Sequence, residues 1–154
     1  MFRSIEPADE GALEAAFHKL SEEARYMRFM APLRYVSPRM LERAVRPAED
    51  HELALIAVEV GGDSAIVGAA RYVGAPGDRS CEFAVTVADD WHRLGLASRL
   101  LGELIQSARS RGLRCMEGFV LAGNTSMLAL ARKLGFEVTA SDEGPRVRYV
   151  RLEL

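Results

Sequence analysis

The sequence has few of the residues that stabilise small secreted proteins or bind structural metals. It contains only two cysteines, Cys81 and Cys115, and both fall inside predicted strands. We therefore expect buried free thiols in a reducing compartment. No second Cys or His pair lies near them in the sequence, so we expect no structural zinc and no metal cofactor.

The sequence also lacks a strong net charge and a long apolar run. Its 20 basic and 22 acidic side chains give a formal net charge of -2, and the basic residues are scattered. This pattern excludes a general nucleic-acid binder. No apolar run is long enough to span a bilayer, and Arg3, Glu6 and Asp9 interrupt the region where a secretory leader would be apolar. We therefore expect a cytoplasmic protein with no nucleic-acid or membrane partner.

No internal repeat, linker or low-complexity tract divides the 154 residues. That length suits one compact domain, so we expect a single domain over residues 1–154 with one core. The hydrophobic share of 49% and the charged share of 27% are ordinary for a globular protein.

The stretch from Cys81 to Gly112 combines a predicted strand, a turn and a predicted helix. Apolar residues alternate from Cys81 to Val87, as they do in a strand. From Gly95 onward the apolar positions recur at helical spacing, and Gly112 ends the helix. The small residues Gly95 and Ala97 let a ligand approach the backbone, where the new helix presents free N–H groups. The turn therefore predicts an anion site suited to phosphate.

Apolar spacing and turn residues predict the remaining elements. Strands are expected over residues 2–5, 53–60, 65–73, 113–121, 136–140 and 146–154. Helices are expected after Pro7, from Ser21 to about Met30, after Ser37-Pro38 and after Asn124. This order of elements predicts a mixed sheet with helices on both faces.

Two motifs carry a resemblance to a known family. The segment HRLGLAS, residues 92–98, resembles the acetyl-CoA pyrophosphate loop of the GNAT acetyltransferases, Gln/Arg-x-x-Gly-x-Gly/Ala. Gly95 and Ala97 fit the small positions, whereas His92 replaces the usual Gln or Arg and Leu94 stands where a basic residue is common. The segment NTSMLALARKLGF, residues 124–136, is similar to the GNAT motif that begins with Asn and ends in Leu-Gly-Phe.

Nearly the whole chain is similar to the acetyltransferase domain of the bacterial protein-lysine acetyltransferases, through segments such as EFAVTVADDW and MEGFVLAGNTSML. The resemblance implies an α/β GNAT fold, with a mixed, mostly antiparallel sheet of six to seven strands flanked by helices on both faces. It implies acetyl-CoA as cosubstrate and a protein lysine amine as acceptor. Two alternatives stay open, namely a small-molecule amine N-acetyltransferase and a non-catalytic acyl-CoA-binding module. We expect a monomer or a homodimer.

Glu82 is the candidate catalytic residue. A lysine amine has a pKa of about 10.4 and must lose a proton before it attacks a thioester. In the resembling lysine acetyltransferases, a glutamate at the position of Glu82 is the general base. A half-buried carboxylate would have a raised pKa that suits this role. The alternative is that Glu82 faces solvent or pairs with an arginine. For Glu117, the second carboxylate on a predicted strand, we prefer a pairing with arginine over a catalytic role.

The resemblance also implies the residues that bind the cofactor. Backbone groups of Val85 and Val87 would pair with the pantetheine arm like an added strand. Asn124 would contact CoA while it caps a helix. Ala131 stands where many GNAT members have a Tyr that protonates the leaving thiolate, so that acid is missing. Arg93 would be the main charge partner of the pyrophosphate, whereas His92 would either donate to it or be a surface residue of the turn. The loop residues that would hold the pyrophosphate are His92, Arg93, Leu94, Gly95, Leu96, Ala97 and Ser98.

Residues 26–30 form an aromatic and methionine stripe at helical spacing. We prefer the interpretation that this stripe belongs to the core. The alternative is an exposed surface on the acceptor side, where Arg25 and Arg28 would attract an acidic patch of a protein.

Overall fold

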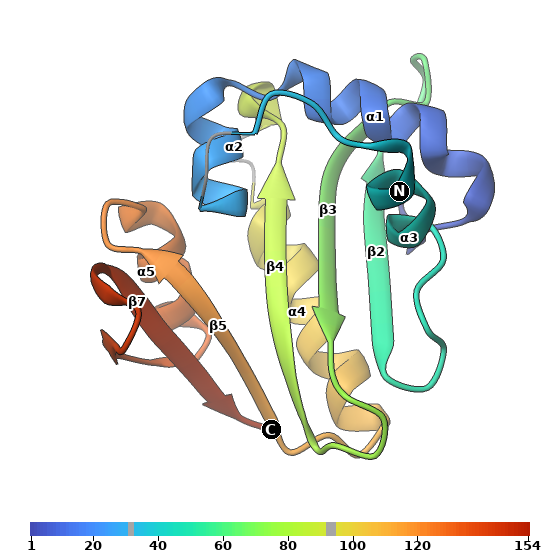
Figure 1. Cartoon of the computed structure of the whole chain (residues 1–154). Helices are drawn as coiled ribbons and strands as arrows, with labels where there is room; N and C mark the ends of the chain where they lie inside the picture. The colour runs from blue at the N-terminus through green and yellow to red at the C-terminus, as the bar shows by residue number, and fades with distance from the viewer. Residues whose placement is uncertain (31–32, 92–94) are drawn as a thin grey trace.

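The structure is a computed structural model that describes residues 1–30, 33–91 and 95–154. In these ranges the helices and strands follow one another as Figure 1 shows. The strands are β1 (Phe2–Ser4), β2 (Glu52–Val58), β3 (Ile66–Val73), β4 (Ser80–Val87), β5 (Cys115–Leu121), β6 (Glu137–Ser141) and β7 (Gly144–Glu153). The helices are α1 (Glu10–Lys19), α2 (Glu22–Phe29), α3 (Pro38–Ala44), α4 (Leu96–Ser110) and α5 (Thr125–Lys133), and the 3₁₀ turns are η1 (Pro7–Asp9) and η2 (Asp89–Trp91).

The seven strands form one sheet in the order β1-β2-β3-β4-β5-β7-β6. Neighbouring strands are antiparallel, except β4 and β5, which are parallel. The crossover between these two strands is the long helix α4, as a parallel pair requires. The predicted fold class, a mixed and mostly antiparallel sheet of six to seven strands, is confirmed.

Helices α4 and α5 cover one face of the sheet. Leu100, Leu101 and Leu104 of α4 are fully buried, and they join Leu128 of α5 in the larger core cluster. Glycine lets α4 approach β3 closely, because a Cβ built on Gly68 would lie 2.9 Å from Leu100 Cδ1. This face of the sheet therefore carries most of the apolar core.

Helices α1, α2 and α3 lie on the opposite face (Figure 1). A second, smaller cluster of buried residues forms there around Ile56 and Val45, which are exposed by 0% and 1%. The predicted arrangement of helices on both faces is confirmed. Side chains only partly fill the space between this face and the three helices, which leaves a cavity there.

The entry to α1 differs from the expectation that Pro7 begins a regular helix. Pro7 instead begins the 3₁₀ turn η1, and α1 starts at Glu10. The buried carboxylate of Asp9 explains the tight turn, because it accepts hydrogen bonds from the backbone N–H of Glu6 (2.7 Å) and from both terminal nitrogens of Arg3 (2.8 and 2.7 Å). Asp9 thus ties the turn to β1.

Most strand ends differ from the expected bounds by one or two residues, as in β2, which ends at Val58 instead of residue 60, and the starts of β5 and β7 have a clear cause. Strand β5 begins at Cys115 instead of residue 113, because Gly112 turns the chain at φ +81° and the Leu113 N–H bonds back to the Ala108 carbonyl of α4. Strand β7 begins at Gly144 instead of residue 146. Its φ of +120° allows a short hairpin that needs few turn residues.

Cys81 and Cys115 are buried and free, as predicted. Among the described residues, no helix has the length and apolar character needed to cross a membrane.

Candidate active site

Strands β4 and β5 separate after a short paired segment. Their register runs only from Ser80 opposite Cys115 to Glu82 opposite Glu117, and the strands then diverge (Figure 1). We call this point the fork. An extended ligand can bind beside a strand of this kind through main-chain hydrogen bonds, as an added strand would. The fork is therefore a suitable place for a long, flexible cofactor arm.

Glu82 is the last residue of β4 that pairs with β5. Its side chain is exposed, where the sequence suggested a half-buried one. Its pKa is nevertheless raised, first by partial desolvation and then by the negative charge of Glu117, while Arg28 opposes the shift. Among the described residues, no arginine lies within ion-pair distance of the Glu82 carboxylate. Glu82 thus reaches solvent and has the raised pKa expected of a base.

Glu117 lies beside Glu82 on the same face of the sheet. Among the described residues, the preferred interpretation, a pairing with arginine, is wrong. The Glu117 carboxylate accepts a 2.5 Å hydrogen bond from the hydroxyl of Tyr149 on β7, and Arg151, opposite Glu117 in the sheet, pairs with Glu153. The hydrogen bond to Glu117 raises the pKa of the Tyr149 hydroxyl. One carboxylate of the fork is therefore held by a tyrosine, and the other is accessible.

Helix α4 begins near the end of β4 that lies beyond the fork, since Leu96 approaches Gly68, which pairs with Val87. The helix has no side-chain cap. Its N-cap is Gly95, which is exposed and adopts a left-handed conformation at φ +76°. A Cβ built on Gly95 would meet no described atom within 4 Å. The first turn contains Leu96, Ala97 and Ser98. The first hydrogen bond within the helix runs from the Arg99 N–H to the Gly95 carbonyl, so these three N–H groups have no acceptor in the helix and point out of its start. This geometry fits the predicted anion site, which the backbone of Gly95, Leu96, Ala97 and Ser98 would form.

The other predicted cofactor residues fall into three groups. His92, Arg93 and Leu94 lie outside the described residues. Val85 and Val87 direct their side chains to the core that α4 covers, so only their backbone could contact a cofactor. The predicted cap is confirmed, because the side chain of Asn124 accepts a 3.2 Å hydrogen bond from the Met127 N–H. A contact of Asn124 with CoA stays a prediction.

Ala131 is fully buried in the core. Its position on α5 therefore offers no group that could protonate a leaving thiolate, in agreement with the missing tyrosine of the second motif.

Residues 26–29 of the stripe lie in α2, which has no buried residue, and Met30 is the C-cap of that helix. The preferred core interpretation is therefore wrong for Tyr26 and Met30, which are each exposed by 39%. Arg28 and Phe29 instead line a cavity of about 370 Å³ between the sheet and helices α1–α3. Helix α2 thus contributes to the wall of this cavity.

Sequence reasoning missed two polar residues of this face, Arg71 and Tyr149. Arg71 of β3 lines the cavity, and Tyr149 holds Glu117. The sequence shows Arg71 as a charged residue inside the otherwise apolar strand 66–73. It also shows Tyr149 at every second position with Val147 and Arg151, on one face of β7. Neither signal identifies a partner, because the partners come from other elements, the end of α3 for Arg71 and β5 for Tyr149.

No group of three or more His, Cys, Asp or Glu side chains that could hold a metal occurs within residues 1–30, 33–91 and 95–154.

Comparison with known proteins places the fork and the α4 turn in context. Residues 13–136 match the model of the Acetyltransferase (GNAT) family. Acetyltransferase PA5475 of Pseudomonas aeruginosa is 32% identical over 137 residues, which cover 88% of this chain and 74% of that protein. The L-methionine sulfoximine/L-methionine sulfone acetyltransferase of Pseudomonas paraeruginosa is 41% identical over 58 residues, or 38% of this chain and 34% of that protein.

Solved structures share the fold along the whole chain. The GNAT domain of S. lividans PAT superposes with a TM-score of 0.90 at 26% identity, covering 99% of this chain and 89% of that one. The acetyltransferase yncA from Salmonella typhimurium, described as putative and solved with its cofactor acetyl-CoA, gives a TM-score of 0.79 at 21% identity, covering 100% and 93%. The family match and the relative from Pseudomonas aeruginosa are sufficient to conclude that this chain belongs to the GNAT family and is an N-acetyltransferase.

Proposed function

We propose that this protein transfers the acetyl group of acetyl-CoA to a primary amine, with Glu82 as the general base. The supporting observation is the position of Glu82 at the fork, on the sheet face that also lines the cavity. Two findings support acetyl-CoA as the donor of the acetyl group. The chain belongs to the GNAT family, and a solved structure of the same fold contains acetyl-CoA.

The reaction requires the amine to lose protons. The ammonium form of the acceptor first gives one proton to the Glu82 carboxylate, directly or through one water. The neutral nitrogen then attacks the thioester carbonyl, so that a C–N bond forms and the C–S bond breaks. The amide nitrogen gives up its remaining excess proton, and the departing thiolate takes up a proton from water because Ala131 offers none. The net products are an amide, free CoA and one proton.

Glu82 suits this role better than Glu117. The raised pKa of Glu82 makes it a stronger base than an ordinary carboxylate. Glu117 already accepts the hydrogen bond of Tyr149. Its charge supports the basicity of Glu82 from the neighbouring strand.

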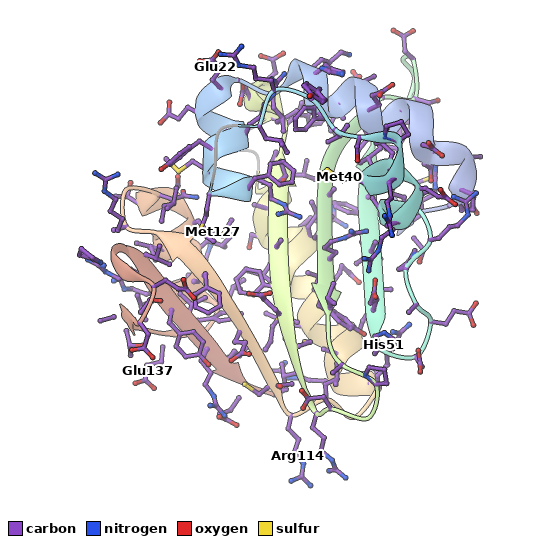
Figure 2. The ribbon with its side chains drawn as sticks, viewed as in Figure 1. Glu22, Met40, His51, Arg114, Met127 and Glu137 are labelled. Carbon is purple, nitrogen blue, oxygen red and sulfur yellow. The ribbon has the colours of Figure 1, made fainter. Side chains whose placement is uncertain are left out.

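The test of Glu82 is transfer of labelled acetyl groups to an amine by wild type and by Glu82→Gln. We expect transfer to fall by roughly 10²–10⁴-fold, the usual contribution of a general base, while acetyl-CoA binding is kept. Glu137→Gln is the matched control, because Glu137 is exposed at the far edge of the sheet (Figure 2). Full activity of Glu82→Gln would remove Glu82 from the mechanism.

The donor site is supported by the left-handed glycine at the start of α4. A glutamate at position 95 would add bulk and negative charge where the pyrophosphate is expected, so Gly95→Glu should abolish acetyl-CoA binding measured by calorimetry. Gly77→Glu is the matched control: Gly77 has φ +78° and no atom within 4 Å of a Cβ, but it lies in the distant turn between β3 and β4. Equal binding by both variants would place the pyrophosphate elsewhere.

The proposed function has two versions, which differ in the molecule that accepts the acetyl group. The sequence resemblance favours a lysine amine of a protein. The cavity favours a small amine, because it lies between the sheet and three helices and includes Val73 and Ala84, which flank Glu82. The partial match to a methionine sulfoximine and methionine sulfone acetyltransferase supports the same version. Labelled acetyl-CoA added to a soluble lysate separates the two, since the label enters either protein bands or the small-molecule fraction.

A further inference from the structure

The cavity between the sheet and helices α1–α3 has mostly apolar walls. Phe17 of α1, Phe29 of α2 and Ile56 of β2 are among the residues that line its volume of about 370 Å³. Met40 of α3, labelled in Figure 2, lines it as well. A space of this size accommodates a small molecule and is at the lower end of typical ligand pockets.

Two arginines enter this apolar cavity from different elements. Arg28 comes from α2 and Arg71 from β3, and both side chains are half-buried. The guanidinium of Arg71 donates a 2.6 Å hydrogen bond to the Ala44 carbonyl at the end of α3. Arg28 stacks over the ring of Phe29, with 4.8 Å from its Cζ to the ring centroid. Both guanidinium groups are therefore held in place by neutral groups.

Neither arginine has a carboxylate partner at ion-pair distance in the part of the chain that the structure describes. Desolvation and, after it, the charge of Arg71 lower the pKa of Arg28 to about 10, while Glu82 opposes the shift. Desolvation also lowers the pKa of Arg71, with Glu52 opposing and Arg43 adding to the shift. Both groups remain protonated at neutral pH, so the cavity contains two neighbouring positive charges at the expense of folding stability.

A bound anion would offset this unfavourable arrangement. Planar guanidinium groups match the geometry of a carboxylate and bind it through charge-assisted hydrogen bonds. The apolar walls would take the remainder of such a molecule, as in most small-molecule sites. The cavity thus has the composition of a site for a small organic acid.

The cavity also adjoins the candidate base. Val73 lies directly opposite Glu82 in the pairing of β3 with β4, and Ala84 lies two residues after Glu82 on the same face. Both residues line the cavity. A molecule bound there by its acid group can therefore extend an amine toward Glu82 and the fork.

We propose that the acceptor is a small amine that also carries a carboxylate, such as an α-amino acid, and that Arg28 and Arg71 bind its carboxylate in this cavity. This inference rests on the proposed function, since it assumes that the amine reacts at Glu82. A protein acceptor is the competing outcome.

The experiment compares matched acceptors. The probes are the proteinogenic L-amino acids and the corresponding α-amides, in which the carboxylate is replaced by a neutral group of nearly the same size. The rate of CoA release with each probe gives kcat/KM for wild type, Arg28→Gln, Arg28→Lys and Arg39→Gln. Arg39 is an exposed arginine of α3 outside the cavity, and its variant is the control.

We expect wild type to prefer at least one acid over its amide by about 10–100-fold, the usual worth of a charge-assisted hydrogen-bond pair. Arg28→Gln should lower the rate with the acid much more than the rate with its amide, and so remove most of this preference. Arg28→Lys should keep part of the preference, and Arg39→Gln should behave as wild type. The melting temperature of each variant shows whether it is folded. The comparison of acid with amide in wild type tests the proposal even if a variant does not fold.

Two results would overturn the inference. Equal rates for acids and amides, lost in Glu82→Gln, would mean that the proposed acetyl transfer is correct but that no carboxylate is recognised. Labelling of proteins with no transfer to any amino acid would assign the acceptor to a protein. A wild-type enzyme that acetylates neither proteins nor small amines would contradict the proposed function itself.

Discussion

Gly118→Ala should destabilise the fold at the point where β4 and β5 separate. Gly118 follows Glu117 on β5 just where the pairing with β4 stops, and the ring of Phe83 lies against it. A Cβ built on Gly118 would lie 2.7 Å from Phe83 Cε1, 3.0 Å from Cδ1 and 3.1 Å from Cζ. These contacts are too short, so the ring would have to move.

The ring has little space in which to move. Phe83 is only 7% exposed, and its centroid lies 5.2 Å from that of Phe136. Overpacking of this kind costs about 1–3 kcal/mol. The added methyl group recovers at most about 0.8 kcal/mol by burial. We therefore expect the free energy of unfolding to fall by about 1–2 kcal/mol, which for a chain of this length lowers the melting temperature by roughly 2–8 °C.

The assay is urea unfolding followed by circular dichroism, with thermal melting as a second measure. Gly102→Ala is the matched control, because Gly102 lies inside α4 and a Cβ there meets nothing within 4 Å. That variant should gain about 0.5–1 kcal/mol, the helical advantage of Ala over Gly. If Gly118→Ala were as stable as wild type, the Phe83 ring would not be confined against β5 and the reasoning would be wrong.

Two further predictions concern stability and reactivity. Asp9→Asn should lower the free energy of unfolding at pH 7 by about 1–3 kcal/mol, measured by urea unfolding. The hydrogen bond from Arg3 holds the pKa of Asp9 below its ordinary value, so the difference from wild type should shrink as the pH falls below about 4. Burial raises the pKa of the Cys81 thiol to about 12 and also raises the pKa of Cys115. Ellman's reagent at pH 8 should therefore label neither thiol in the native protein and both after denaturation; rapid native labelling would contradict their burial.

The fold could be predicted from the sequence because its elements are marked locally. Alternation defined the strands, helical spacing defined α4, and Ser21, Ser37 and Asn124 each cap a helix as expected. The errors lie at element ends. The hydrogen bonds of Asp9 set the start of α1, and the conformation of Gly112 delayed β5; both depend on contacts that a periodic pattern does not contain.

The site was predictable only in part, for a physical reason. Glu82 and Gly95 follow from one continuous strand–turn–helix segment, whose chemistry the sequence shows directly. The cavity requires α2, α3 and β3 to meet, and the charges of Arg28 and Arg71 acquire meaning only when they share an apolar space. The hydrogen bond between Tyr149 and Glu117 likewise joins residues that are 32 positions apart in the sequence. Such juxtapositions arise from the topology of the sheet and not from local spacing.

The two carboxylates of the fork can be distinguished by their effect on the pH dependence of the reaction. Desolvation and, after it, the charge of Glu117 raise the pKa of Glu82. A general base must be ionised, so the acid limb of kcat/KM reports the pKa of that base. Glu117→Gln removes the neighbouring charge but not the desolvation, which lowers the pKa of Glu82 and keeps it above its ordinary value. The acid limb should therefore move to lower pH while transfer continues.

The control for this experiment is Tyr149→Phe, which removes the hydrogen bond to Glu117 but keeps its negative charge. Its acid limb should stay much closer to that of wild type, because the charge and not the hydrogen bond acts on Glu82. Each contrary outcome has a separate meaning. If transfer were lost in Glu117→Gln and kept in Glu82→Gln, Glu117 would be the base. If the acid limb did not move in Glu117→Gln, the charge of Glu117 would not reach the titrating group, and the assignment of that limb to Glu82 would be wrong.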